Sequence, residues 1–276
     1  MSTGATVLLG AIAGFTIFLG LPVGRMQSQS FKLKTVLNGV SAGVLIFLLI
    51  DIFSHAGEQV EHAFESAAEG EAGWLRAAAL AAIYVLGFGG GLLGLLYVTK
   101  IGKRRPSNVS LGPGAMAVAE PTVAHSEALR LGMSIAGAIG LHNFSEGLAI
   151  GQAANRGAMS LALLLVVGFA LHNATEGFGI VGPLAATDTR PSWGWLALAG
   201  LAGGGPTFLG SLIGTAFSSD FIFVAFLALA GGAIVYVVGE LFAVGRRLSW
   251  NATLVGVLIG FLIGFGTEII LEIAGG

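Results

Sequence analysis

The sequence contains no cysteine and little charge, and each absence excludes a class of protein. Without cysteine the chain can form neither disulfides nor thiolate metal sites. Only 10% of its 276 residues are charged, against roughly a quarter in soluble globular domains. The formal net charge of −2 gives no reason to expect a nucleic-acid partner. The N-terminus also lacks the positive segment of a signal peptide, so we expect the first apolar run to be retained.

Long apolar runs fill most of the chain instead. Hydrophobic residues make up 55% of it, and its 45 glycines suit helices that pack closely in lipid. A membrane helix needs about 20 apolar residues. We therefore predict an all-α integral membrane protein with one polytopic domain, residues 1–276, in the cell membrane (a bacterial inner membrane or its equivalent). Its eight expected spans are 6–23, 35–54, 74–98, 128–154, 160–182, 193–217, 221–244 and 251–273.

Loop charges predict the orientation of these spans. Ten of the 13 Lys and Arg residues lie in the first, third, fifth and seventh loops. Cytoplasmic loops carry the excess of Lys and Arg, so these loops are expected to be cytoplasmic and both termini extracytoplasmic. The second loop, 55–73, has five glutamates and two histidines but no Lys or Arg. It is either a solvated amphipathic segment or an outward-facing collector of cations.

Two matching motifs place polar side chains in the middle of apolar spans. His142 and Glu146 are i and i+4 on a helix, so they share one face, and His172 and Glu176 repeat this spacing. An asparagine follows each histidine, Asn143 in the first motif and Asn173 in the second. A short loop makes the two spans antiparallel, so the motifs are expected to meet at similar depth. Buried carboxylates are costly there. A divalent cation held by imidazole, carboxylate and amide oxygens would stabilise them, and such ligands suit Zn²⁺, Fe²⁺, Mn²⁺ or Co²⁺.

Three further polar residues have two interpretations each. Glu240, in the seventh span, either lines the same pathway or reaches the membrane interface along its own helix. Asp51 and His55, one turn apart at the outer end of the second span, either form an entrance site or are helix-end side chains. The spacing of Gly87 and Gly91 suits close packing of helices, within one protomer or between the two protomers of a homodimer.

These motifs resemble those of the ZIP (Zrt/Irt-like) divalent metal transporters. The likeness rests on the two His-Asn-x-x-Glu-Gly motifs, on "GGGPTFLGSLIG" in the sixth span and on "GGAIVYVVGE" ending at Glu240. It implies uptake of Zn²⁺, or of Fe²⁺, Mn²⁺ or Cd²⁺, toward the cytoplasm. It also implies an inverted-repeat helix bundle and a mid-membrane site that is often binuclear. The metal would be substrate, with no catalytic cofactor.

The resemblance also implies two ligand sets. One consists of His142, Glu146, His172 and Glu176, and the other of Asn143, Glu146, Asn173, Glu176 and Glu240. The chain departs from the family pattern where Ser145 and Thr175 replace the usual prolines. A proline would break the helix, whereas Ser and Thr perturb it mildly.

Two other functions compete with transport. An intramembrane metallohydrolase would also need buried His and carboxylate ligands, with an open position for water and usually a separate general base. The chain has no H-E-x-x-H order and no obvious extra catalyst beside the motifs. A metal-sensing or structural membrane protein would give the acidic second loop less purpose.

Overall fold

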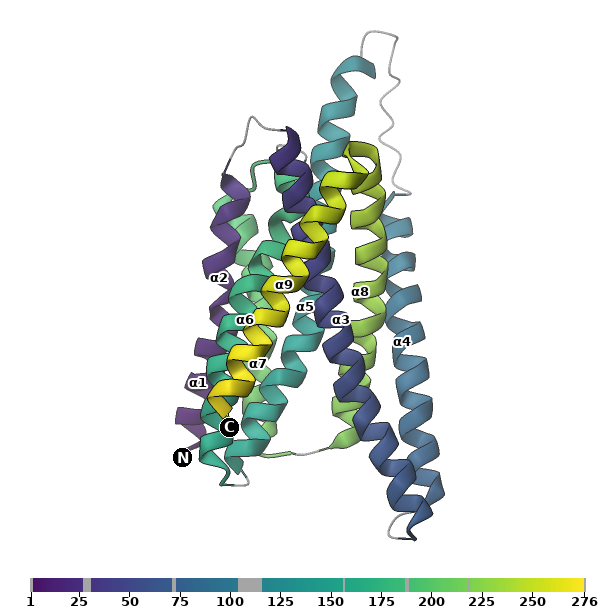
Figure 1. Cartoon of the computed structure of the whole chain (residues 1–276), viewed down its shortest axis with the longest axis vertical. Helices are drawn as coiled ribbons and strands as arrows, with labels where there is room; N and C mark the ends of the chain where they lie inside the picture. The colour runs from purple at the N-terminus through teal and green to yellow at the C-terminus, as the bar shows by residue number, and fades with distance from the viewer. Residues whose placement is uncertain are drawn as a thin grey trace.

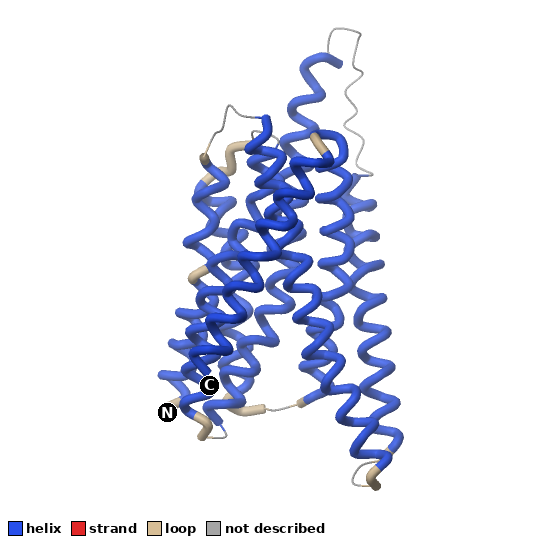
Figure 2. The backbone as a smooth tube through the Cα atoms, in the orientation of Figure 1, coloured by secondary structure: helices blue, strands red, loops and turns tan. Residues whose placement is uncertain are grey.

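The computed structural model is a bundle of helices (Figure 2). It describes residues 2–26, 31–70, 73–103, 116–155, 157–186, 189–217 and 219–275, and the elements assigned in these ranges are all helical. They are α1 (Thr3–Phe15), α2 (Ile17–Gly20), the 3₁₀ helix η1 (Leu21–Arg25), α3 (Phe31–Ala68), α4 (Trp74–Lys103), α5 (Met116–Asn155), α6 (Met159–Ala186), α7 (Trp193–Gly214), α8 (Asp220–Leu248) and α9 (Trp250–Gly275).

The chain is a multi-pass membrane protein by the length and composition of these helices. Seven helical segments of the described chain are long and apolar enough to cross a bilayer: Thr3–Arg25, Thr35–Ala68, Trp74–Tyr97, Ala162–Leu184, Trp193–Gly214, Asp220–Leu248 and Trp250–Ile269. The eighth predicted span, 128–154, lies within α5, a helix of 40 residues. It is not among the seven. The buried His, Asn and Glu of the first motif lower its hydropathy.

The second span is longer than predicted. We expected it to end at residue 54, but α3 continues as one helix to Ala68. Its extension is held by an apolar cluster of its own, in which Ala63 and Ala67 pack with Ala77 and Leu80 of α4 and with Val224 of α8. The segment predicted as the start of a loop is therefore a rigid helical hairpin arm, with Glu58, Glu61 and Glu65 exposed on it.

The helices form two groups that meet along a seam. In the motif unit, α5 packs on α6 and α7, and α1 packs on α6 and α7. In the flanking unit, α3 packs on α8 and α9, and α4 packs on α8. The seam consists of the contacts of α3 with α6, α5 with α8, and α6 with α9. Both predicted motifs lie in the motif unit, on the two helices that face the flanking unit.

Both ends of the chain lie at the same end of the bundle. Figure 1 marks the N- and C-termini at its lower end, where α3 also turns into α4. An even number of crossings places the termini in this way. Which side of the membrane this end faces remains the prediction made from the loop charges.

Candidate metal centre

The motif side chains that the structure describes are buried together between α5 and α6. Asn143, Asn173 and Glu176 are fully buried, and His142 and Glu146 are 4% and 5% exposed. Helical spacing places Asn and Glu three residues apart on each helix, on neighbouring turns. Because α5 and α6 pack against each other, the two motifs meet as the sequence predicted. The result is a polar centre inside an apolar bundle.

The side-chain amide of Asn143 is surrounded by acceptors. Its Nδ2 donates to Oδ1 of Asn173, to Oε2 of Glu176 at 3.1 Å and to the backbone carbonyl of Gly203 at 3.0 Å. A rotated amide would direct its own oxygen at these three acceptors, so the orientation is fixed by the surroundings. The Oδ1 of Asn143 accepts no hydrogen bond from the described residues. This amide oxygen can therefore serve as a ligand without breaking a bond seen here.

The second asparagine makes the reciprocal contacts. The Nδ2 of Asn173 donates to Oε2 of Glu146 and to the carbonyl of Ala13, each at 3.3 Å. Each asparagine thus holds the glutamate of the opposite motif and a backbone carbonyl, on α1 in one case and α7 in the other. The two asparagines differ in one respect, because the Oδ1 of Asn173 already accepts from Asn143.

Backbone acceptors on α1 and α7 were not among the residues predicted for the site. Ala13 lies just before Thr16, where α1 gives way to α2, and the Thr16 hydroxyl also donates to the Ala13 carbonyl at 2.7 Å. On α7, Gly203 lies one turn before Thr207, which is fully buried. In the sequence, the glycine run before Pro206 was the available signal, whereas the α1–α2 break lies inside the span predicted at 6–23. Which carbonyls α1 and α7 present depends on how the helices pack.

The glycines after each glutamate allow backbones to approach closely. A Cβ atom at Gly147 would lie 2.2 Å from the carbonyl oxygen of Thr207 on α7. A Cβ atom at Gly177 would lie 2.4 Å from that of Ile17 on α2. Neither position has room for a side chain. The motif helices are therefore seated against α7 and α2 at the level of the glutamates.

His142 lies beside the glutamate of its own motif, with its Nε2 3.3 Å from Oε1 of Glu146. On α3, which packs on α6, Nδ1 of His55 lies 3.2 Å from Oδ1 of Asp51. His55 is exposed and Asp51 is half-buried, and an entrance site at this pair stays a prediction.

Glu240 lies far from the motifs. Phe226 of α8 packs on Phe144 of α5 with ring centroids 4.2 Å apart, which sets the level of the motif on α8. Glu240 follows Phe226 by about four helical turns, a rise of about 21 Å. It is half-buried, toward the end of α8 that carries Arg246 and Arg247. The structure therefore does not bring Glu240 to the second ligand set.

The predicted ligand sets are only partly described. The backbone of His172 lies in α6, but its side chain is outside the described part of the chain. Among the side chains that are described, no three of the His, Asp and Glu type gather in an arrangement able to hold a metal ion. What the structure shows instead is a chain of contacts, in which His142 lies beside Glu146 and the two asparagines link Glu146 to Glu176.

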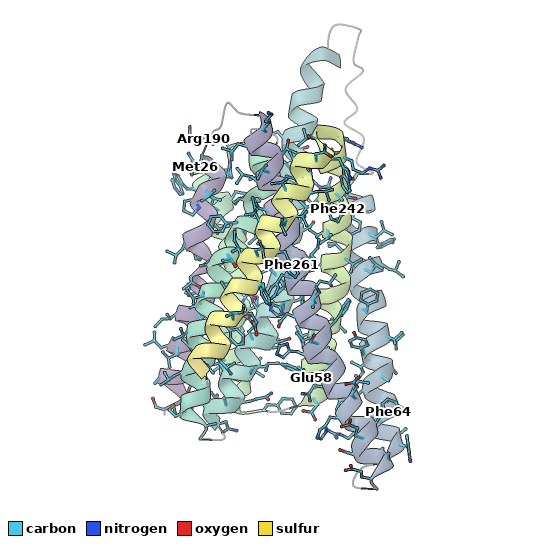
Figure 3. All side chains as sticks on the ribbon, in the orientation of Figure 1. Met26, Glu58, Phe64, Arg190, Phe242 and Phe261 are labelled. Carbon is cyan, nitrogen blue, oxygen red and sulfur yellow. The ribbon has the colours of Figure 1, made fainter. Side chains whose placement is uncertain are left out.

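The hairpin arm carries a second polar region. Glu58 lies at its start in Figure 3, and together with Gln59, His62, Arg76 and Asp220 it lines a surface hollow. Arg76 forms an ion pair with Asp220 there, joining the starts of α4 and α8. The arm belongs to the same helix as the Asp51–His55 pair.

Comparison with known proteins relates part of the chain to a zinc transporter. No family model matches the chain. A zinc transporter, ZupT of Lysinibacillus sphaericus (strain C3-41), is 30% identical over 146 residues. The match covers 49% of this chain and 50% of that protein. The chain therefore spans about half the length of the relative that it matches, and it is similar to a zinc transporter over that part.

Proposed function

We propose that this protein is not an enzyme but a transporter of divalent transition-metal ions, with Zn²⁺ as the first candidate and Fe²⁺, Mn²⁺ and Cd²⁺ as others. It would carry them across the cell membrane toward the cytoplasm. The observation that carries the proposal is the reciprocal bonding of the two motifs, in which each asparagine holds the opposite glutamate. The partial similarity to a zinc transporter supports it.

The chemistry of the centre favours a divalent cation. Two carboxylates, Glu146 and Glu176, are buried between the same two helices. An unpaired charge at such depth costs at least about 3 kcal/mol, and two like charges also repel each other. Amide donors offset part of this cost without neutralising the charge. A divalent cation bridging the carboxylates would neutralise both, and imidazole, carboxylate and amide oxygens are ligands that suit such a cation.

The ligand assignment follows from the contacts. We propose that a first metal is held by His142, Glu146, Glu176 and, as the resemblance implies, His172. A second metal would share the glutamates and take the free amide oxygen of Asn143. Asn173 would join that set through the second lone pair of its Oδ1, because the first accepts a hydrogen bond from Asn143. Glu240 would act further along the pathway, at the end of α8.

Matched contacts support an inverted repeat around this site. Asn143 of α5 bonds to Gly203 of α7, while Asn173 of α6 bonds to Ala13 of α1. The pairing of α5 with α7 thus corresponds to that of α6 with α1. In the flanking unit, the pairing of α3 with α9 likewise corresponds to that of α8 with α4. Such a repeat would let the two units rock against each other and expose the site to either side in turn.

A homodimer stays a proposal of the same kind. The described glycine contacts use Gly87 and Gly91 within the protomer, against Ala228 and Leu229 of α8. A dimer would therefore use another face of α4, which is the least buried of the apolar spans.

Flux in proteoliposomes tests the proposal. Purified protein in sealed vesicles containing a Zn²⁺-sensitive dye should give saturable uptake, reduced by competing Cd²⁺, Fe²⁺ or Mn²⁺. The Glu146→Ala and Glu176→Ala variants should be folded but inactive. Hydrolysis of membrane-peptide or ester substrates by the wild-type protein, without metal flux, would instead favour the intramembrane metal-dependent hydrolase.

A further inference from the structure

An apolar cavity opens along the seam between the two units. It has a volume of about 250 Å³ and is lined by Val23 of η1, Leu37 and Val40 of α3, Phe178, Val181 and Gly182 of α6, and Ile263 of α9. All these residues are apolar and lie in or beside apolar spans. Within a bilayer, such a cavity excludes ions and polar ligands and accepts hydrocarbon.

Cations lie at the end of the bundle to which this cavity is nearest. Arg25 ends η1, two residues after Val23, and Lys32 is exposed in the first turns of α3, before Leu37. Arg190 precedes Pro191, whose carbonyl accepts from Arg25, and Figure 3 labels Arg190 at the same end of the bundle as Met26. Three positive charges therefore surround one corner of the bundle, at the level expected for lipid headgroups.

These charges are not neutralised by the described protein. Arg25 donates to the carbonyl of Pro191 and lies over the Trp193 ring, 4.6 Å from its centroid, and both partners are uncharged. The ion pairs among described side chains lie elsewhere, and none includes Arg25, Lys32 or Arg190. Basic clusters of this kind, beside crevices between membrane helices, bind anionic lipid headgroups.

We propose that this corner binds one anionic phospholipid, with an acyl chain in the seam cavity and its phosphate beside Arg25, Lys32 and Arg190. The cavity supplies the apolar half of the site and the cations supply the charged half. Neither half depends on metal binding, so the proposal is independent of the proposed function.

The position of the site gives it a consequence. The cavity adjoins the contact of α3 with α6, where the Ser41 hydroxyl lies within hydrogen-bond distance of the Phe178 carbonyl, at 3.2 Å. An acyl chain here touches both units at once. If the units move against each other during transport, as proposed above, lipid occupancy changes the rate of that movement.

Native mass spectrometry of the purified protein tests lipid binding directly. Titration with palmitoyl-oleoyl phosphatidylglycerol should give one saturable adduct, while phosphatidylcholine with the same chains binds much more weakly. Glycerol phosphate alone should not compete, because it lacks the acyl chain. Removing two cations in Lys32→Gln/Arg190→Gln should weaken binding about fivefold per charge. The matched control is Arg246→Gln/Arg247→Gln, which removes two exposed charges from the end of α8 and should bind like wild type.

Filling the cavity tests the acyl-chain half. Val40→Phe should reduce phosphatidylglycerol binding while the protein elutes as one species, and Leu37→Phe is the second variant if the first does not fold. Equal binding of the two lipids, equal loss in both double variants, or unchanged binding in a folded cavity variant would each overturn the proposal. If neither cavity-filling variant can be purified, the comparison of lipid binding between the two double charge variants still tests the proposal. Loss of lipid binding with intact metal flux would leave the proposed function standing, and the reverse result would leave the lipid site standing.

Discussion

Asn143 and Asn38 are both fully buried, but they make different contacts. The Nδ2 of Asn143 faces three acceptors at the motif centre, while the Nδ2 of Asn38 donates to the carbonyl of Leu241. Replacing Asn143 by Ala leaves buried acceptors without a donor, which costs about 1–3 kcal/mol. It also removes the free amide oxygen. We expect both a lower thermal unfolding temperature and weaker metal binding, measured by calorimetry in detergent.

The Asn38→Ala variant is the matched control for that substitution. It should lower the unfolding temperature but leave metal affinity at the wild-type value, because Asn38 lies outside the motif centre. Equal effects of the two substitutions on metal affinity would mean that Asn143 acts only through stability, and the ligand assignment would be wrong.

For individual residues, the sequence predicted the motif side chains of the centre but not the backbone carbonyls to which they bond. The i, i+4 spacing alone places His142 beside Glu146, and the structure has them 3.3 Å apart. The carbonyls of Ala13 and Gly203 could not be predicted in the same way. They reach the site only because of the register at which α1 and α7 pack on the motif helices, which spacing within one helix does not determine.

The helices α5 and α7 meet through glycine. An alanine at position 147 would place its Cβ 2.2 Å from the Thr207 carbonyl, so one helix must move. Overpacking of this kind costs about 1–3 kcal/mol. We expect Gly147→Ala to lower the thermal unfolding temperature and to reduce transport, because the shift displaces Glu146.

Gly137 provides the control on the same helix. A Cβ atom there meets nothing within 4 Å. Gly137→Ala should therefore leave activity unchanged and, since alanine favours helix, raise stability by up to about 1 kcal/mol. The packing argument fails if Gly147→Ala is as stable and active as Gly137→Ala.

The end of α3 could not be predicted from the sequence. Hydrophobic length predicted an end for the second span at residue 54, yet α3 continues to Ala68. The glutamates of this stretch predict a loop or a solvated amphipathic segment. Its alanines, Ala63 and Ala67, are what keep it helical, because they pack against α4 and α8. Composition shows where a chain leaves the bilayer, not where its helix ends.

Charge is unevenly distributed over the whole molecule, and variants of the hairpin arm test whether its glutamates attract metal ions. Glu58, Glu61 and Glu65 are exposed on one end of the bundle, where a cluster of one sign raises the local concentration of cations. Replacing all three by Gln should raise the KM for metal uptake roughly threefold at low ionic strength, with kcat unchanged. In about 1 M salt the difference should vanish, because the screening length falls to about 3 Å.

Glu127→Gln is the control for the triple variant. It removes an exposed carboxylate from α5, on a different helix from the hairpin arm of α3. It should leave KM unchanged at any ionic strength. A salt-independent rise in KM for the triple variant would point to direct ligation by the arm rather than to collection of cations.

The division into two units was only partly accessible from the sequence. Apolar length identified seven spans of the described chain, while the predicted span within α5 carries the polar motif and is not among them. Resemblance to a transporter family implied a repeat, but the grouping of α1, α5, α6 and α7 against the other helices depends on long-range contacts. The seam cavity and its basic corner arise from the same contacts and left no pattern in the sequence.

The central claim is that a divalent metal binds between the two crossed motifs, and anomalous scattering from Cd²⁺-soaked crystals tests it most directly. The account predicts a cadmium peak within ligand distance of the Glu146 and Glu176 carboxylates, with any second peak beside the Oδ1 of Asn143. The Glu146→Gln variant should lose the peak between the carboxylates. Cadmium bound only on the exposed hairpin arm, or a central peak of unchanged occupancy in that variant, would contradict the account.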